Sequence, residues 1–199
     1  MRNERWKICF RFARSLQQAS RLLGFAVALL VCASLANAQN SQCSLKLAQL
    51  PDAPELFGFR LGMTTEQVKA RVPQVQFGKT TDFGVLQTSV NPDFDPKIDK
   101  TSFVGVRTVS LDFLDDGLTS LWFGYDSSFR WKTVDEFVAG ISRSLQLPKA
   151  WTPWKSKGQQ LRCADFQMTV TFVAEGPSFR ILDLNAQEIL TARREADTN

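Results

Sequence analysis

The sequence predicts an α+β fold in which helices pack on one face of a mainly antiparallel β-sheet. Two observations support this prediction. Thr64 and Thr133 are each followed, three residues later, by a side chain that completes a helix capping box. Between and after these helix starts, short segments alternate apolar and polar residues with the period of two that is typical of half-buried strands.

The N-terminal 38 residues are predicted to be a secretory signal peptide. A positively charged stretch precedes an apolar run at 22–35, and Ala36-Asn37-Ala38 matches the small-x-small pattern of a cleavage site. The apolar run is shorter than the roughly 20 residues that span a bilayer. We expect cleavage near Ala38, a periplasmic or secreted mature chain of residues 39–199, and no stable membrane span in that mature chain.

Two alternatives to cleavage near Ala38 remain open. Leu29-Leu30-Val31-Cys32 has the spacing of a lipoprotein signal, so that Cys32 would be lipidated, although Val31 stands where a small residue is expected. The second alternative is that the apolar segment is retained as an anchor.

The positive charge of the chain belongs to the signal. The chain has 24 basic and 20 acidic residues, and residues 1–38 hold six of the basic and one of the acidic, so residues 39–199 carry a net charge of −1. We therefore expect no nucleic-acid partner. About 161 residues are enough for a single domain with a sizeable core.

Cys43 and Cys163 are the two cysteines that lie beyond the signal. An even number of cysteines in an oxidising compartment predicts a disulfide bond, which would tie the start of the mature chain to a central strand. The alternative is a pair of free thiols. A reactive pair is not expected, because the chain has no Cys-x-x-Cys motif and no histidine to activate a thiol.

The first half of the mature chain is predicted to be a helix followed by three strands. Thr64 is the expected N-cap, Gln67 completes the capping box, and Pro73 ends the helix. The strands are expected at 84–90, 107–114 and 118–125, with a hairpin turn at Asp115-Asp116-Gly117 between the last two.

The second half repeats this order. Thr133, with Glu136 three residues later, begins a helix that ends before Pro148. Strands are expected at 160–163, 166–172 and 179–184, with a turn or bulge at Ala164-Asp165. Asn185, with Glu188 three residues later, is the expected N-cap of a C-terminal helix.

The two halves share short sequence features. Phe59-Arg60-Leu61 and Phe129-Arg130-Trp131 precede the two helix starts, so residues 57–125 and 129–185 are candidates for a diverged tandem repeat. Because capping boxes are common and the identities are few, chance similarity is the alternative.

The helix start resembles that of a known envelope family. Leu61-Gly62-Met63-Thr64, followed by Gln67-Val68, is similar to the segment found in the SmpA/OmlA (BamE-type) outer-membrane assembly family. The doubled helix-plus-sheet order also resembles the β-lactamase-inhibitor-protein architecture. These resemblances imply a helix-on-sheet fold and a binding or assembly role in the envelope.

No residue pattern indicates catalysis. The absence of histidine removes Ser-His and Cys-His nucleophiles, His-containing zinc sites and the usual general base at neutral pH. Aspartates form two clusters, at Asp93, Asp95 and Asp99 and at Asp112, Asp115 and Asp116. The first lacks the glycine and final glutamate of an EF-hand loop, and the second surrounds a turn, where aspartate is favoured for backbone reasons. We expect a protein that is not an enzyme and has no metal or cofactor; a hydrolase that uses carboxylates is the alternative.

Aromatic residues provide the candidate binding site, because Trp and Tyr bury a large area and keep a polar group. The candidate binding residues are Tyr125, Trp131, Trp151, Trp154 and Lys155. Trp151 and Trp154 are predicted to lie together in an exposed loop rich in proline and lysine. The alternative for Trp131 is that it lies in the hydrophobic layer beneath the helices. Trp122 is expected to lie in that layer too.

These features predict an exported binding or envelope-assembly module that acts through its sheet face and the aromatic loop, with an envelope protein as partner. The alternative is a carrier of a small apolar ligand. The 16 phenylalanines suggest this, because a cleft between helices and sheet suits such a ligand.

Overall fold

The computed structural model describes residues 43–173 and 176–198, which belong to one compact unit. The predicted signal peptide, its cleavage site and the lipidation alternative at Cys32 lie outside the described residues. Within the described part of the chain, no helix combines the length and the apolar character that crossing a bilayer requires.

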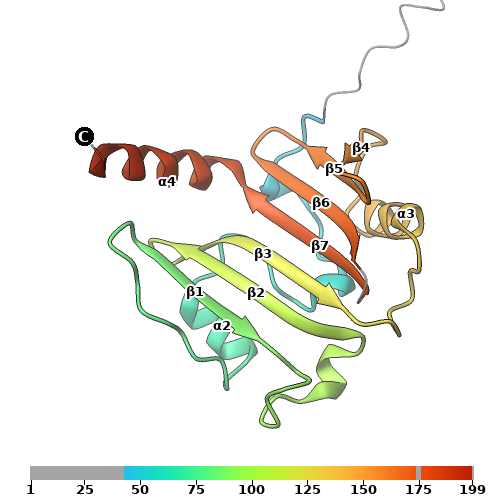
Figure 1. The fold of residues 1–199 in the computed structure, drawn as a ribbon, viewed down its shortest axis with the longest axis horizontal. Helices are drawn as coiled ribbons and strands as arrows, with labels where there is room; N and C mark the ends of the chain where they lie inside the picture. The colour runs from blue at the N-terminus through green and yellow to red at the C-terminus, as the bar shows by residue number, and fades with distance from the viewer. Residues whose placement is uncertain (1–42, 174–175, 199) are drawn as a thin grey trace, which may run out of the picture. The chain divides into compact units, whose positions relative to one another are not determined.

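The described residues form one seven-stranded sheet in which every neighbouring pair of strands is antiparallel. Across the sheet the order is β1-β2-β3-β7-β6-β5-β4 (Figure 1). The strands are β1 Val85–Val90, β2 Val106–Leu114, β3 Gly117–Tyr125, β4 Thr152–Trp154, β5 Gly158–Arg162, β6 Phe166–Val173 and β7 Gly176–Asp183. The predicted α+β fold class is confirmed.

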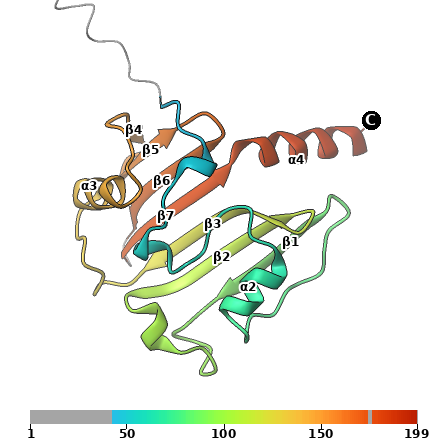
Figure 2. The ribbon, with the colours of Figure 1, turned by 180° about the vertical axis from the view of Figure 1, so that it is seen from behind.

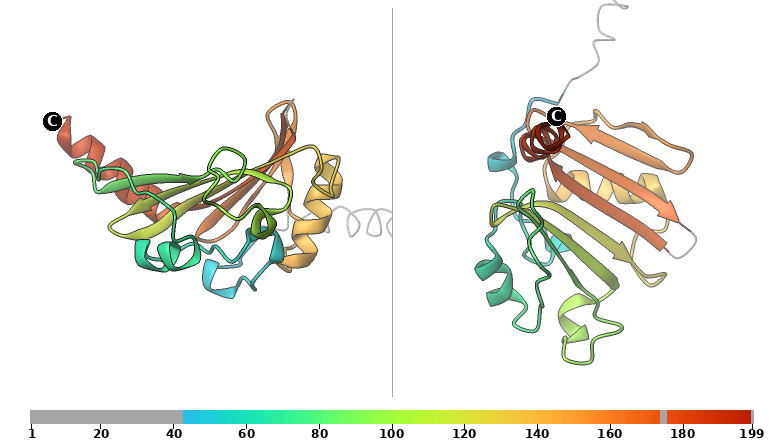
Figure 3. Two further views of the ribbon diagram at one scale, coloured as in Figure 1. Left: turned by 90° about the horizontal axis from the view of Figure 1, so that it is seen from below. Right: turned by 60° about the vertical axis from the view of Figure 1, so that its left-hand side comes forward.

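The helices α2 and α3 lie on one face of this sheet (Figures 2 and 3). The helices are α2 Thr65–Arg71, α3 Val134–Ser144 and α4 Leu184–Asp197, and the 3-10 turns are η1 Leu47–Gln49, η2 Pro54–Leu56 and η3 Lys100–Phe103. Val68 of α2 and Phe137 and Ile141 of α3 are fully buried in the same apolar cluster as the side chains of one sheet face. The core therefore lies between that face and the helices.

The two predicted helix starts are confirmed, with one difference. At α2 the capping box is complete, because the Gln67 N–H donates to Thr64 Oγ1 (3.2 Å) and the Thr64 N–H donates to Gln67 Oε1 (2.9 Å). At α3 the Glu136 N–H donates to Thr133 Oγ1 (3.1 Å), but the Glu136 carboxylate accepts from the N–H of Lys132 (2.7 Å) and not of Thr133. The glutamate side chain therefore pairs with the backbone N–H of the residue before the N-cap, and not with that of the N-cap itself.

The C-terminal helix begins two residues earlier than predicted. The N-cap of α4 is Asp183, whose Oδ1 accepts the N–H of Ala186 (3.1 Å), so the prediction of Asn185 as cap is wrong. Asp183 shares the strand phase of Phe179 and Ile181, where an apolar residue would be expected. It is polar because it ends β7 and caps the helix.

Helices α2 and α3 are each followed along the chain by an antiparallel meander of three strands. Strands β1-β2-β3 form one antiparallel meander after α2, strands β5-β6-β7 form another after α3, and β3 pairs with β7 to join them. The order expected for residues 57–125 and 129–185 is therefore present in the topology. The second half has one additional strand, β4, which pairs with β5 at the sheet edge.

The β2–β3 turn connects the sheet to two helices. Asp115 and Asp116 both have positive φ (49° and 69°), which gives the two-residue turn that matches the twist of a hairpin. Asp116 Oδ1 accepts from the N–H and hydroxyl of Thr65 at the start of α2 (3.1 and 2.5 Å). Asp115 accepts two hydrogen bonds from Arg193 of α4 (2.9 and 2.5 Å). The turn predicted at this position is confirmed.

The predicted disulfide bond between Cys43 and Cys163 is present, with Cα atoms 4.5 Å apart. Cys163 directly follows β5, so the bond reaches the β5–β6 turn and not a central strand. Two hydrogen bonds accompany it, from the Ala164 N–H to the carbonyl of Leu45 (3.1 Å) and from the Leu47 N–H to Asp165 (2.9 Å). The N-terminal segment is therefore held to this turn.

Candidate functional site

The two faces of the sheet differ in what covers them. Leu111, Phe123 and Phe179 point to the helix side, and each is fully buried. Their neighbours along each strand point to the other face, because side chains alternate along a strand. That face carries mostly polar side chains, and neither α2 nor α3 packs on it (Figure 3). We call it the uncovered face.

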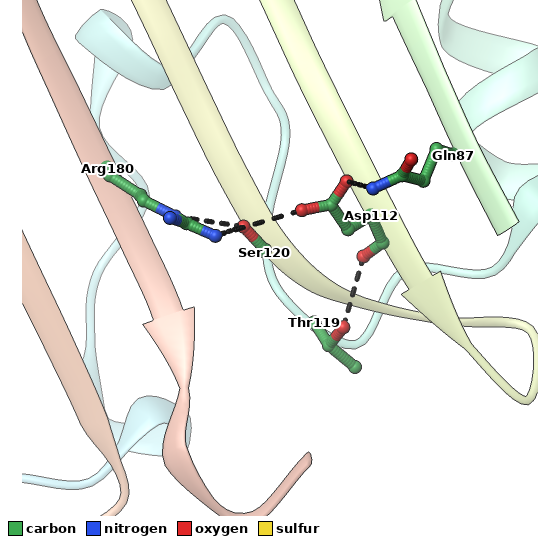
Figure 4. Close-up of polar contacts among 5 residues, drawn as sticks. All are labelled: Gln87, Asp112, Thr119, Ser120 and Arg180. Carbon is green, nitrogen blue, oxygen red and sulfur yellow. Dashed lines mark hydrogen bonds and ion pairs between the residues drawn. The ribbon is translucent and has the colours of Figure 1, made fainter. Parts of the chain in front are cut away.

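A chain of polar side chains crosses four strands of the uncovered face (Figure 4). Gln87 of β1 donates from Nε2 to Asp112 Oδ1 on β2 (2.9 Å), and Arg180 Nη2 on β7 lies 3.8 Å from Asp112 Oδ2. Between them, Ser120 of β3 accepts from Arg180 Nε and Nη2 (3.2 and 3.0 Å). The hydroxyl of Thr119 donates to the backbone carbonyl of Asp112 (3.1 Å). Asp112 lies directly opposite Gln87 and Ser120, and Arg180 reaches Ser120 diagonally from its position opposite Trp122.

This polar chain fixes the direction of two charged groups. The side chains of Arg180 and Asp112 are 48% and 30% exposed, so their ion pair is screened by solvent and adds little to stability. Ser120 is buried, and its hydroxyl holds the guanidinium close to the sheet. The cation and the anion therefore both have defined positions on this face.

Trp122 lies beside this polar chain. It pairs across the sheet with Ser110 on β2 and Arg180 on β7, and it is half-buried. A Cβ added to Gly124 would fall 2.6 Å from Cη2 of the Trp122 ring, so the indole lies over that glycine. The expectation that Trp122 closes the layer beneath the helices is wrong, because Leu121 on the same strand points there and Trp122 points the opposite way.

Trp154 is at the other end of the uncovered face. It pairs with Gly158, which is opposite Thr171, and Thr171 is opposite Ser178 of β7. Ser178 in turn is opposite Gly124. A cross-strand row of small residues therefore separates the two tryptophans.

Trp151 lies on the helix side, away from Trp154. Its Nε1 donates to Ser142 Oγ of α3 (2.9 Å), and its ring packs against the apolar core. The prediction of one exposed loop with both tryptophans is wrong, because residues 152–154 form strand β4. Lys155 is exposed next to β4, with Nζ 5.5 Å from the centre of the Trp154 ring.

Tyr125 and Trp131, both predicted to be binding residues, instead pack against other parts of the chain. Tyr125 is fully buried, its hydroxyl donates to the backbone carbonyl of Glu55 (3.1 Å), and burial raises the pKa of the phenol well above its usual range. Trp131 lies against Gly140 of α3 and makes an edge contact with Phe137, with ring centres 4.8 Å apart. Tyr125 is therefore not available to a partner, and the Trp131 ring is already in contact with α3.

The aspartates considered for metal binding are engaged locally. Asp93 lies 3.4 Å from Lys100 Nζ, and Asp95 accepts the N–H of Lys97 (2.9 Å). Hydrogen bonds from Thr101 lower the pKa of Asp99, which caps η3. Within residues 43–173 and 176–198, no three His, Cys, Asp or Glu side chains are grouped so as to hold a metal ion.

The polar chain was not among the candidate residues predicted from sequence. The sequence points to Asp112 only as part of a turn cluster and does not single out Gln87, Ser120 or Arg180. Asp112 and Arg180 each lie between two apolar residues on their strands, which signals an outward position, whereas Gln87 and Ser120 each have only one apolar neighbour. What the sequence does not contain is the strand order that brings β1, β2, β3 and β7 together.

Comparisons with models of protein families, with curated proteins and with solved structures find no match for this chain.

Proposed function

We propose that this protein is an exported, non-enzymatic binding module of the periplasm or cell exterior, and that an envelope protein docks on the uncovered face. The observation that carries the proposal is Trp122, half-buried on the face on which neither α2 nor α3 packs and flanked by Arg180 and Asp112 in fixed positions. Trp and Arg are the side chains that most often dominate the energy of a protein interface.

The fixed geometry of this face favours binding. A side chain that becomes ordered on association costs about 0.5–1.5 kcal/mol. The Arg180 side chain already donates hydrogen bonds to Ser120, and the two carboxylate oxygens of Asp112 already face Gln87 and Arg180. Binding a protein would therefore cost less side-chain entropy at these two residues. Charges of both signs beside Trp122 would also reject a partner with the wrong charge pattern.

The same geometry does not favour acid–base catalysis. Asp112 is the carboxylate at the centre of the face, and its oxygens are occupied by the Gln87 amide and the Arg180 guanidinium. The resemblance of the helix start to the BamE-type assembly family also supports a binding role.

Affinity capture from an envelope extract tests the proposal. Tagged mature protein (residues 39–199) is compared with the variants Trp122→Ala and Gly124→Ala. The second variant keeps every side chain of the face but displaces the Trp122 ring, because its Cβ would lie 2.6 Å from Cη2. Lys69→Ala, on the exposed side of α2, is the matched control.

We expect one partner that the wild type and the control recover and that both face variants lose, although circular dichroism shows them to be folded. Recovery of the same partner by Trp122→Ala would contradict the assignment of the site. Recovery of no partner by the wild type would count against the binding module itself.

A second candidate function, transport of a small apolar ligand, is supported by a cleft between the N-terminal segment and the sheet. The cleft has a volume of about 510 Å³, and its floor contains Leu121, Leu145 and Ile181. This volume is within the range of small-molecule sites. Native mass spectrometry of the purified protein tests the candidate: a co-purified small mass supports it, and the bare chain mass alone argues against it.

A further inference from the structure

A separate cleft lies between α3 and the β4–β5 hairpin, on the helix side of the sheet. Its volume is about 530 Å³. Val138 and Ala139 of α3, Leu147 after the helix and Trp151 give it an apolar lining. The indole of Trp151 is fixed by its hydrogen bond to Ser142, so this wall has a defined position.

The charged groups at the two ends of the cleft differ. Asp135 lies at the N-terminal end of α3, and its Oδ1 accepts a hydrogen bond from Gln159 Nε2 (2.8 Å). Arg143 lies eight residues later on the helix, which corresponds to about 12 Å along its axis. Lys149 joins Arg143 among the lining residues. One end is therefore anionic and closed by a hydrogen bond, and the other is cationic.

The two cations have no counter-ion in the described chain. Neither Arg143 nor Lys149 takes part in an ion pair among residues 43–173 and 176–198, and both are exposed. Two such cations at the end of an apolar cleft complement a ligand with an anionic group and an apolar body. A guanidinium matches a carboxylate well, because its planar fork donates two parallel hydrogen bonds.

We propose that this cleft binds a small amphipathic carboxylate. The carboxylate group lies between Arg143 and Lys149, and the apolar body lies along Val138, Leu147 and Trp151 toward the Asp135 end. The volume of the cleft is in the range of small-molecule sites. The proposal is independent of the uncovered face, because the cleft is on the opposite side of the sheet.

Titration of the mature protein with decanoate, followed by NMR, tests the proposal. The readout is the indole N–H signal of Trp151, assigned with the variant Trp151→Phe. Decanol, which has the same chain and no charge, is the ligand control. The variant Arg143→Gln/Lys149→Gln removes both cations, and Lys69→Gln/Lys97→Gln makes the same charge change away from the cleft.

We expect saturable shifts of the Trp151 signal with decanoate. Because ion pairs with exposed cations are worth about 0.2–1 kcal/mol each, decanol and the cleft variant should each bind several-fold more weakly than decanoate binds to the wild type. The control variant should bind decanoate as the wild type does.

Four results would overturn the proposal. Equal affinity for decanol and decanoate would show that the cations do not recognise the ligand. Unchanged affinity of the Arg143→Gln/Lys149→Gln variant for decanoate would likewise show that these two cations do not recognise the carboxylate. Absence of saturable binding, or shifts at Trp122 in place of Trp151, would show that the cleft is not the site. Of these results, only shifts at Trp122 would bear on the uncovered face.

Discussion

Replacing Gly140 by alanine should destabilise the protein, although it improves the helix propensity of α3. Gly140 is in the interior of α3, where alanine is favoured over glycine by about 1 kcal/mol. A Cβ at this position would fall on the Cζ2 and Cε2 atoms of Trp131, with Cη2 only 2.6 Å away. The indole ring must therefore move as a whole, since these atoms are part of a rigid ring.

The cost of that movement follows from the contacts of Trp131. Its ring makes edge contacts with Phe129 and Phe137, with ring centres 5.4 and 4.8 Å apart, and such pairs are worth about 0.5–1.5 kcal/mol each. The Arg130 guanidinium lies 4.5 Å from the ring centre, which adds about 0.5–1 kcal/mol. Loss of most of these contacts exceeds the propensity gain, so we expect a net destabilisation of about 1–2 kcal/mol, in the range measured for overpacked sites.

Urea denaturation of Gly140→Ala, Trp131→Ala and the double variant measures this effect. With an unchanged slope, a lower midpoint for Gly140→Ala gives the destabilisation. In the Trp131→Ala background the obstruction is gone, and the same change should stabilise by about 1 kcal/mol. A stabilisation of equal size in both backgrounds, with a coupling energy below about 0.5 kcal/mol, would refute the reasoning. Trp131 would then be free of α3 and again a candidate for partner binding.

Three further changes probe other parts of the fold. Removing the disulfide with Cys43→Ala/Cys163→Ala should cost about 5 kcal/mol in the chain-entropy view, since the residues are 120 apart; a loss below about 1 kcal/mol in guanidinium denaturation would contradict it. Hydrogen bonds from Arg193 lower the pKa of Asp115, so the pair stabilises the fold above the usual aspartate pKa of about 3.9, and this contribution is lost as the pH falls through the lower folded-state value. In Arg193→Gln, carboxyl NMR should show the Asp115 pKa closer to its ordinary value, and an unchanged pKa would argue against the pair. Thr64→Ala should destabilise by about 1 kcal/mol through loss of the α2 cap, and a loss under about 0.5 kcal/mol in urea would mean that the capping box contributes little.

The elements that the sequence predicts well are those with local signals. The starts at Thr64 and Thr133, the Asp115-Asp116 turn and the alternation of β2 each depend on residues within a few positions of one another. The sequence does not predict strand β4, because Pro153 lies at its centre and proline is typical of loops. Proline is also tolerated on edge strands, which is where β4 lies.

The candidate site was harder to predict, because it depends on which face each residue occupies. Trp122 and Phe123 are adjacent and both large, yet one is on the uncovered face and the other in the core. Residue type alone favours a core position for both. The Arg180 side chain reaches Ser120, 60 residues away, only because β7 pairs with β3. No local pattern encodes that pairing.

Photo-crosslinking from the uncovered face is the most direct test of the account. A photoreactive benzoyl-phenylalanine replaces Ser110, the cross-strand neighbour of Trp122, in one sample and Lys69 of α2 in another. After irradiation in cells or in envelope extract, we predict one discrete protein adduct from position 110 and none from position 69. An adduct from position 69 with none from position 110 would contradict recognition through the uncovered face.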